Sequence, residues 1–125
     1  MNSTLIYDKK LKLSNIITRL DNSKSKTLFV LSKNRTLIGA ISDGDIRRCI
    51  VKNKGLDFII DDVINYEPIS VSKNTAYEKI NFMFKNYSLK AIPVLGPNKK
   101  IQKIIHLSEF HKNTFPQSLK KSAKI

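Results

Sequence analysis

Cysteine and histidine, which build many catalytic and metal sites, are scarce in this sequence. Cys49 is the only cysteine, and His106 is one of two histidines. A single thiol cannot close an intramolecular disulfide or complete a cysteine-based zinc site, so we expect Cys49 to be a buried structural thiol. No nucleophile stands beside a base, and no paired acids lie in an apolar setting. The sequence therefore predicts a chain with no catalytic residues, no metal and no required cofactor.

Long apolar runs are also missing. No stretch approaches the roughly 20 apolar residues that a membrane span needs. Lys9, Lys10, Lys12 and Arg19 interrupt the only apolar stretch near the N-terminus, which excludes a secretory signal peptide. With 41% hydrophobic and 26% charged residues in a chain of 125, the sequence predicts one soluble, cytoplasmic domain.

Acidic residues are outnumbered by basic ones, and the formal net charge is +13. The excess lies at the two ends: residues 1–42 carry +6, residues 43–86 are neutral and residues 87–125 carry +7. Clustered arginines, interleaved aromatic residues and a recognition-helix pattern are all lacking, so nucleic-acid binding is the less favoured interpretation.

The main positive feature is an internal repeat. When the chain is shifted by 64 residues, KTLFVLSKNRTLIGAISDGDI (26–46) aligns without a gap on KAIPVLGPNKKIQKIIHLSEF (90–110). Each copy has an amphipathic helical segment, two short apolar strands joined by a turn, and a second helix. Two such copies bury their open apolar faces by stacking. The pattern predicts an α/β (α+β) pseudo-dimer of two helix–strand–strand–helix repeats.

Three local features refine this prediction. GLDFIIDDVI between the copies indicates a short helical connector, and EPISVS after it indicates an extended segment. Ser72 or Asn74 is a candidate cap for the helix that follows. Pro93 favours an edge strand or the start of a strand.

The segments LIGAISDGDIRR, VINYEPISVS and SLKAIPVLGPNKKIQKIIHLSEF together resemble the tandem cystathionine-β-synthase (CBS) domain pair, or Bateman module. The resemblance covers residues 5–110. It implies two pseudo-symmetric β-α-β-β-α repeats, the first over 5–55 and the second over 69–112, with a connector over 56–68. Residues 113–125, which are basic and contain Pro116, are expected to form a linker or tail.

The sequence motif SDGDIRR is similar to the corresponding motif of CBS pairs fused to sugar-phosphate enzymes. One such group is the N-terminal pair of sugar-phosphate nucleotidyltransferase-like proteins, and another is the C-terminal pair of arabinose-5-phosphate isomerases. Because the pair begins close to Met1, we expect the first arrangement, with the catalytic domain following residue 125.

The segment ISDGDIRRCI (41–50) has three competing interpretations. Ser42 and Asp45 have the spacing of a capping box at a helix start. A helix N-terminus can also bind phosphate, and the resemblance implies that Ser42 contacts sugar-phosphate oxygens while Asp45 binds the ribose hydroxyls. A metal loop around Asp43 and Asp45 fits poorly, because the spacing does not match a calcium site. We expect Arg47 or Arg48 to pair with Asp61 or Asp62, and the other arginine to line a dimer surface.

The resemblance also places the other side of this nucleotide site. The strand starts of the opposite repeat, including Pro68, would flank the base, and Lys90 would reach the phosphate. The implied site consists of Ser42, Asp45, Ile69, Ser70, Lys90, Ala91 and Pro93.

A second, weaker site is expected at the matching position of the other copy. There His106 replaces Ser42, Glu109 replaces Asp45, and Lys103 replaces Gly39, the glycine expected to let a ligand approach. His106 is more often a satisfied strand-end histidine than a ligand or a pH switch. The predicted second site consists of Lys26, Thr27, His106 and Glu109.

The resemblance implies a non-catalytic regulatory module that binds an adenine nucleotide (AMP, ADP or ATP). It further implies a homodimer that regulates a fused or partner sugar-nucleotide enzyme. The alternatives left open are a purely structural dimerisation module without a ligand, a CBS pair of the arabinose-5-phosphate isomerase type, and a nucleic-acid binder.

Overall fold

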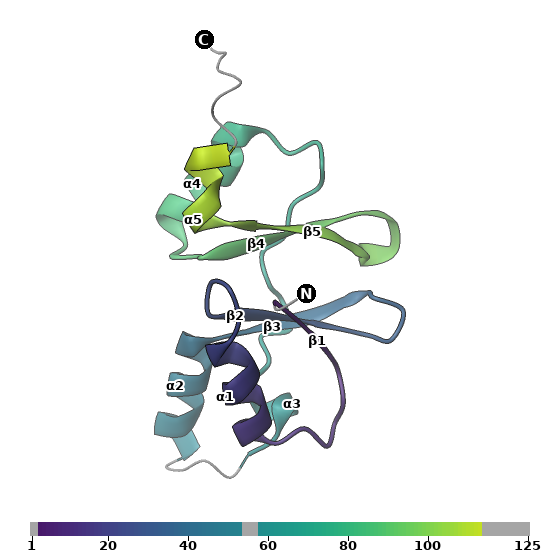
Figure 1. The fold of residues 1–125 in the computed structure, drawn as a ribbon, viewed down its shortest axis with the longest axis vertical. Coiled ribbons are helices and arrows are strands. Elements are labelled where there is room, and N and C mark those ends of the chain that lie inside the picture. Colours follow the sequence, from purple (N-terminus) through teal and green to yellow (C-terminus); the bar gives the residue numbers. More distant parts are fainter. Residues whose placement is uncertain (1–2, 54–57, 114–125) are drawn as a thin grey trace.

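The chain folds into two stacked halves whose β-sheets face each other, with helices on the outer faces (Figure 1). The computed structural model describes residues 3–53 and 58–113. The first half contains β1 (Thr4–Ile6), α1 (Leu13–Asp21), β2 (Thr27–Leu31), β3 (Leu37–Ser42) and α2 (Asp43–Asn53). The short helix α3 (Ile60–Val63) leads to the second half, which contains α4 (Tyr77–Asn86), β4 (Ala91–Leu95), η1 (Pro97–Lys99), β5 (Ile101–His106) and α5 (Leu107–Asn113). Every helix in the described ranges is too short or too polar to cross a membrane.

The 64-residue repeat holds at the level of single residues. Strands β4 and β5 begin and end 64 residues after β2 and β3, and both hairpins shift register at the equivalent place. Thr36 and Lys100, which are equivalent positions, form an antiparallel bridge between the two hairpin loops. The loops therefore meet on the axis that relates the two repeats.

The first strand is the element that differs between the repeats. In the first half, β1 runs parallel to β2, and the Phe29 N–H donates to the Ser3 carbonyl at 2.8 Å. The residue equivalent to Phe29 is Pro93, which has no N–H to donate. In the second half the parallel pairing is accordingly reduced to one bridge, between Val71 and Val94.

The position of Pro93 confirms one part of the sequence expectation and corrects another. Pro93 is fully buried in the middle of β4, so it does not start the strand. It does lie on an edge strand, because β4 pairs along its length only with β5. The missing N–H faces the side on which β4 has only the Val71 bridge, so the antiparallel ladder between β4 and β5 is unaffected.

Three apolar clusters stabilise the fold. One fills each repeat between its sheet and its helices, and the third lies between the two sheets. Cys49 is buried in the first repeat, with Sγ 3.6 Å from the Asp62 carbonyl, as expected of a structural thiol. The buried residues between the sheets are Phe29, Leu31, Ala40, Ala91 and Ile101.

The predicted cap of α4 is wrong. The helix begins after Ala76, and neither Ser72 nor Asn74 caps it. Instead, the Ser72 N–H donates to Thr75 Oγ1 at 3.1 Å, and the Asn74 N–H donates to Ser72 Oγ at 3.3 Å. These polar groups form a separate turn ahead of the helix, because Ser and Thr hydroxyls satisfy local backbone groups as well as caps.

The connector crosses the first sheet at Gly39. Ala40 exchanges two backbone hydrogen bonds with Asn65, at 2.9 and 2.8 Å, so the connector extends the edge of β3. A Cβ atom on Gly39 would lie 2.5 Å from the Asn65 carbonyl oxygen and 2.6 Å from Cγ2 of Ile64. The glycine therefore makes room for the connector, not for a ligand as the sequence suggested. Residues 114–125 of the predicted tail lie outside the described residues.

We expect Gly39→Ala to destabilise the protein by about 1–3 kcal/mol, because the new methyl group meets backbone that cannot move without breaking the connector pairing. Gly44→Ala is the matched control, since its Cβ would face only the Arg48 guanidinium, 3.2 Å away at the end of an exposed side chain. Alanine also favours the helix there. Denaturant unfolding of both variants measures the difference; equal stabilities would contradict the role assigned to Gly39.

Candidate functional site

A cavity of about 510 Å³ lies where the two repeats meet at the start of α2. This volume is in the range of small-molecule sites. The end of β3 and the first turn of α2 form one side, with Ser42 and Asp45. The start of β4 forms the other side, with Lys90 and Ala91. The cavity is therefore shared between the repeats.

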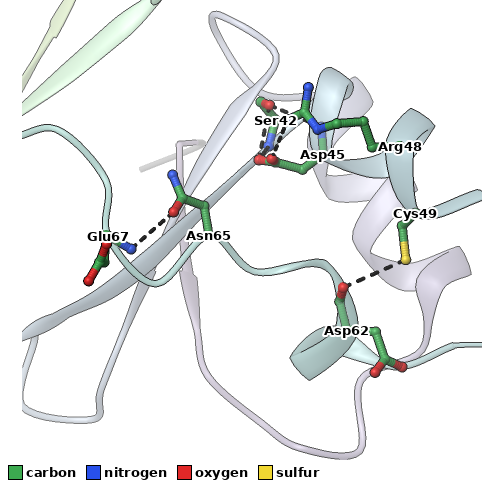
Figure 2. A network of polar contacts seen from close by, with 7 residues as sticks. All are labelled: Ser42, Asp45, Arg48, Cys49, Asp62, Asn65 and Glu67. Atoms are coloured by element: carbon green, nitrogen blue, oxygen red, sulfur yellow. Dashed lines mark hydrogen bonds and ion pairs between the residues drawn. The ribbon is translucent and has the colours of Figure 1, made fainter. Parts of the chain in front are cut away.

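Ser42 and Asp45 form the predicted capping box (Figure 2). The Ser42 N–H donates to Asp45 Oδ2 at 2.9 Å, and the Asp45 N–H donates to Ser42 Oγ at 3.3 Å. The Ser42 hydroxyl also donates to Asp45 Oδ2 at 3.0 Å. The pair thus starts α2 and at the same time presents a carboxylate and a hydroxyl to the cavity.

Arg48 is a site residue that the sequence reasoning missed. Its Nη2 donates to Asp45 Oδ1 at 2.7 Å (Figure 2). Its side chain also lines the cavity. Among the described residues, neither Arg47 nor Arg48 forms the expected ion pair with Asp61 or Asp62. The spacing of Asp45 and Arg48 was the available signal, because residues three apart share one face of a helix.

The two aspartates offered as partners have other roles. Asp61 accepts a hydrogen bond of 2.5 Å from the Tyr7 hydroxyl, and this bond is the main reason that the pKa of Tyr7 rises to about 12. Asp62 accepts from the Ile59 N–H at 3.1 Å and closes the start of α3. Both carboxylates therefore fix the connector in place.

The Asp45 carboxylate retains limited capacity for a ligand. A carboxylate offers about four acceptor sites. Three are used by the Ser42 N–H, the Ser42 hydroxyl and Arg48. One ribose hydroxyl can be accepted without rearrangement, whereas a bidentate contact requires Arg48 to move. The Arg48 side chain is 74% exposed, so moving it costs little.

The two lysines that line the cavity, Lys26 and Lys90, differ in whether their ammonium groups have partners in the protein. Lys26 Nζ donates to the Asp21 carbonyl at 2.7 Å and lies 3.5 Å from the Asp21 carboxylate. The exposed ammonium of Lys90 has no hydrogen bond or ion pair with the described part of the chain. Lys90 is thus the cationic side chain in the cavity wall that has no competing partner among residues 3–53 and 58–113.

The connector lines part of the cavity. The Glu67 N–H donates to Asn65 Oδ1 at 3.0 Å in a local turn (Figure 2). This turn brings Pro68 and Ile69 into the cavity wall. Ser70 and Pro93, also predicted for this site, do not line the cavity: Ser70 is exposed and Pro93 is buried within β4.

The predicted second site is divided between two places. Lys26 and Thr27 line the cavity described above, whereas His106 and Glu109 line a different one. Ser25 Oγ lies 2.6 Å from His106 Nδ1, and Lys24 forms an ion pair with Glu109. Both proposed ligand groups of the second site are therefore in contact with the loop before β2. Among the described residues, no three His, Cys, Asp or Glu side chains converge as metal ligands.

The environment of His106 disfavours its charged form. Burial lowers the pKa of His106 from its ordinary value of 6.5, and the positive charge of Lys24 lowers it further, while Glu109 acts in the opposite direction. Lys103 lines the same cavity as His106. The imidazole is therefore neutral near pH 7 in the folded protein.

Comparisons with known proteins identify the fold. No protein-family model and no curated protein match the sequence. The structure of CBSX2 in complex with AMP is similar with a TM-score of 0.73 and 17% identity, over 90% of this chain and 87% of that one. The CBS domain pair of protein MJ0100, in complex with 5′-methylthioadenosine and S-adenosyl-L-methionine, has a TM-score of 0.69 and 16% identity over 92% and 93% of the two chains. A CBS-domain protein from Agrobacterium tumefaciens, ATU1752, has a TM-score of 0.71 and 12% identity, over 90% of this chain and 87% of that one. The predicted fold class, a tandem CBS-domain pair, is confirmed.

We expect the stability contributed by His106 to be full above pH 6.5 and to fall as the pH drops from there through the lowered pKa of the folded state. The unfolded chain binds the proton first, so acidification favours unfolding. The melting temperature of the wild type should fall more between pH 7.5 and 5.5 than that of His106→Gln, which cannot titrate. Parallel curves for the two proteins, or a His106 ring that titrates above pH 6.5 by NMR, would refute this assignment.

Proposed function

We propose that this chain is a non-catalytic sensing module that binds an adenine nucleotide (AMP, ADP or ATP) in the cavity between its repeats. The observation that carries the proposal is the convergence of the Ser42–Asp45 pair with the unpaired ammonium of Lys90 across one cavity of about 510 Å³. Adenosine ligands in two proteins of the same fold, CBSX2 and MJ0100, support the choice of adenine.

The side chains suggest how the nucleotide lies. Asp45 accepts from the ribose hydroxyls, and Ser42 turns its hydroxyl proton from Asp45 to a sugar-phosphate oxygen. Lys90 neutralises phosphate charge together with the positive end of α2. The apolar surfaces of Pro68 and Ile69 flank the base. Each part of the nucleotide thus meets a group of matching chemistry.

The module is proposed to act as a homodimer that regulates a fused or partner sugar-phosphate nucleotidyltransferase in the cytoplasm. Large apolar side chains on the outer helices support self-association: Val51 on α2 is 72% exposed and Phe82 on α4 is 55% exposed. A nucleotide would act by biasing the packing of the repeats and of the dimer. The enzyme resemblance rests on the sequence SDGDIRR.

A purely structural dimerisation module is the second candidate. It is favoured by the internal contacts of Asp45 with Arg48 and of His106 with Ser25, which satisfy these side chains without a ligand. The two candidates differ in one measurable property, because a ligand that binds only the folded state must raise the melting temperature.

We expect AMP, ADP or ATP at millimolar concentration to raise the melting temperature of the wild type, with a smaller effect of GMP. Lys90→Gln should weaken the binding of the effective nucleotide by about tenfold in calorimetry, because one charge-assisted contact is lost. Lys79→Gln is the matched control, since Lys79 is exposed on α4 and lines neither wall of the cavity. If no nucleotide raises the melting temperature, the result favours the purely structural module. If Lys90→Gln and Lys79→Gln affect nucleotide binding equally, Lys90 is not part of the site.

The role of Asp45 is tested by combining a ligand change with a protein change. We expect 2′-deoxy-AMP to bind the wild type about tenfold more weakly than AMP, because a hydrogen bond to a carboxylate is lost. In Asp45→Asn the difference between the two ligands should shrink, while the asparagine side-chain oxygen can still accept the hydrogen bond from the Ser42 N–H at the start of α2. An undiminished difference in the variant would show that another group binds the 2′-hydroxyl.

A further inference from the structure

The two hairpin loops form a cluster of positive charge that we call the basic edge. The loop 32–36 joins β2 to β3, the loop 96–100 joins β4 to β5, and both lie at the side of the molecule away from α2 and α5 (Figure 1). Because the loops are 64 residues apart in the sequence, no single segment of the chain shows this cluster. The basic edge consists of four exposed residues: Lys33, Arg35, Lys99 and Lys100.

The four cations have no partner in the described part of the chain. Neither an ion pair nor a side-chain hydrogen bond joins any of them to residues 3–53 and 58–113. Lys24, Lys26 and Arg48, by contrast, each form an ion pair elsewhere in the fold. Repulsion among grouped cations opposes folding, and a bound polyanion relieves it.

The backbone holds the basic edge in place. Thr36 of one loop and Lys100 of the other form an antiparallel bridge, and the Ile101 N–H donates to the Arg35 carbonyl at 3.4 Å. Arg35 and its repeat equivalent Lys99 have positive φ angles of 72° and 59°. Glycine and asparagine adopt this conformation at lower cost, so the chain carries cations at two positions where the backbone favours other residues. The cations are therefore presented by a fixed surface.

The positive surface continues into a cavity of about 740 Å³ beside β1. Its lining contains four basic side chains and one acid, Asp8. The Asp8 carboxylate accepts a hydrogen bond from the Lys10 N–H at 2.9 Å, so part of its capacity is already used. An anion that follows the basic edge therefore meets further cations. The basic residues that line the cavity are Lys9, Arg19, Lys33 and Arg35.

The other side chains of the loops indicate the kind of polyanion. The loops SKNRT (32–36) and GPNKK (96–100) contain serine, threonine and asparagine but no aromatic residue and no Leu, Ile, Val or Met. Such polar residues, with Arg and Lys, contact phosphate and sugar in nucleic-acid complexes. The core of a protein interface needs apolar or aromatic anchors, and a single strand needs aromatic platforms for its bases. The loops therefore match the phosphate-lined outer surface of a duplex.

We propose that the basic edge binds the phosphate backbone of a nucleic-acid duplex, DNA or RNA, without reading its sequence. Duplex DNA carries one charge per about 1.7 Å of its axis, so a small surface meets several phosphates. Clustered arginines are lacking along the sequence, but folding assembles one arginine and three lysines into a cluster. No residue of the basic edge lines the cavity at Ser42 and Asp45, so this interaction is separate from the proposed nucleotide site.

The test measures binding of the full chain to labelled DNA and RNA duplexes of about 20 base pairs by fluorescence anisotropy, between about 50 and 200 mM salt. The logarithm of the association constant for DNA should fall with the logarithm of the salt concentration with a slope of about −3.6, because four phosphate contacts release counterions. Arg35→Gln and Lys99→Gln should each reduce the magnitude of this slope by about 0.9, whereas Arg35→Lys keeps the charge and should not. Lys79→Gln, which removes the same charge from α4, is the matched control and should leave the slope unchanged.

Three results would overturn the proposal. The first is the absence of binding to either duplex with about 1 mM protein at the lowest salt concentration. The second is an equal change of slope in Arg35→Gln, Lys99→Gln and Lys79→Gln. The third is tighter binding of a single strand, a poly-glutamate peptide or vesicles that contain phosphatidylserine, which would assign the basic edge to another class of partner.

Two further measurements separate a loss of binding from other causes. The unfolding curve of each variant verifies that it is folded. Nucleotide binding by Arg35→Gln should equal that of the wild type, because Arg35 does not line the cavity at Ser42 and Asp45. A failure of either proposal therefore leaves the other measurable.

Discussion

Burial of the apolar faces between the two sheets determines the rest of the structure. Phe29 and Leu31 of one repeat pack with Ala91 and Ile101 of the other. This contact brings the start of β4 opposite the start of α2, which neither repeat alone could achieve. The cavity at Ser42 and Asp45 therefore exists only because the two sheets stack, and any change that separates the sheets also removes the cavity.

The backbone of the two repeats is symmetric, but the side chains that control access are not. Gly39 admits the connector across β3, whereas Lys103 stands at the same place in β5. Phe29 extends the first strand pairing through its N–H, whereas Pro93 cannot. Substitutions at two equivalent positions thus accompany the different strand and connector contacts of the two repeats. Apparent duplication in such a chain does not imply two equal binding sites.

The sequence predicted those features that depend on periodicity and local spacing. The strands followed from the 64-residue offset, and the Ser42–Asp45 capping box followed from its spacing. The start of α4 was placed too early, because hydroxyls such as that of Ser72 can form a turn as easily as a cap. The contact of Arg48 with Asp45 does follow a local rule, because residues three apart share one face of a helix. The contacts of Lys24 and Ser25 with the second repeat join residues 85 and 81 positions apart, and no local pattern predicts them.

Asp45 can serve both the fold and a ligand because its two oxygens have different partners. Oδ2 holds the start of α2 through the two hydrogen bonds from Ser42. Oδ1 holds only the exposed guanidinium of Arg48, an interaction that contributes about 1 kcal/mol or less at a surface. A ribose hydroxyl that displaces Arg48 therefore leaves the helix cap intact. In the proposed complex, the ligand replaces the exposed Arg48 contact with a part-buried one, and Arg48 is released from Asp45.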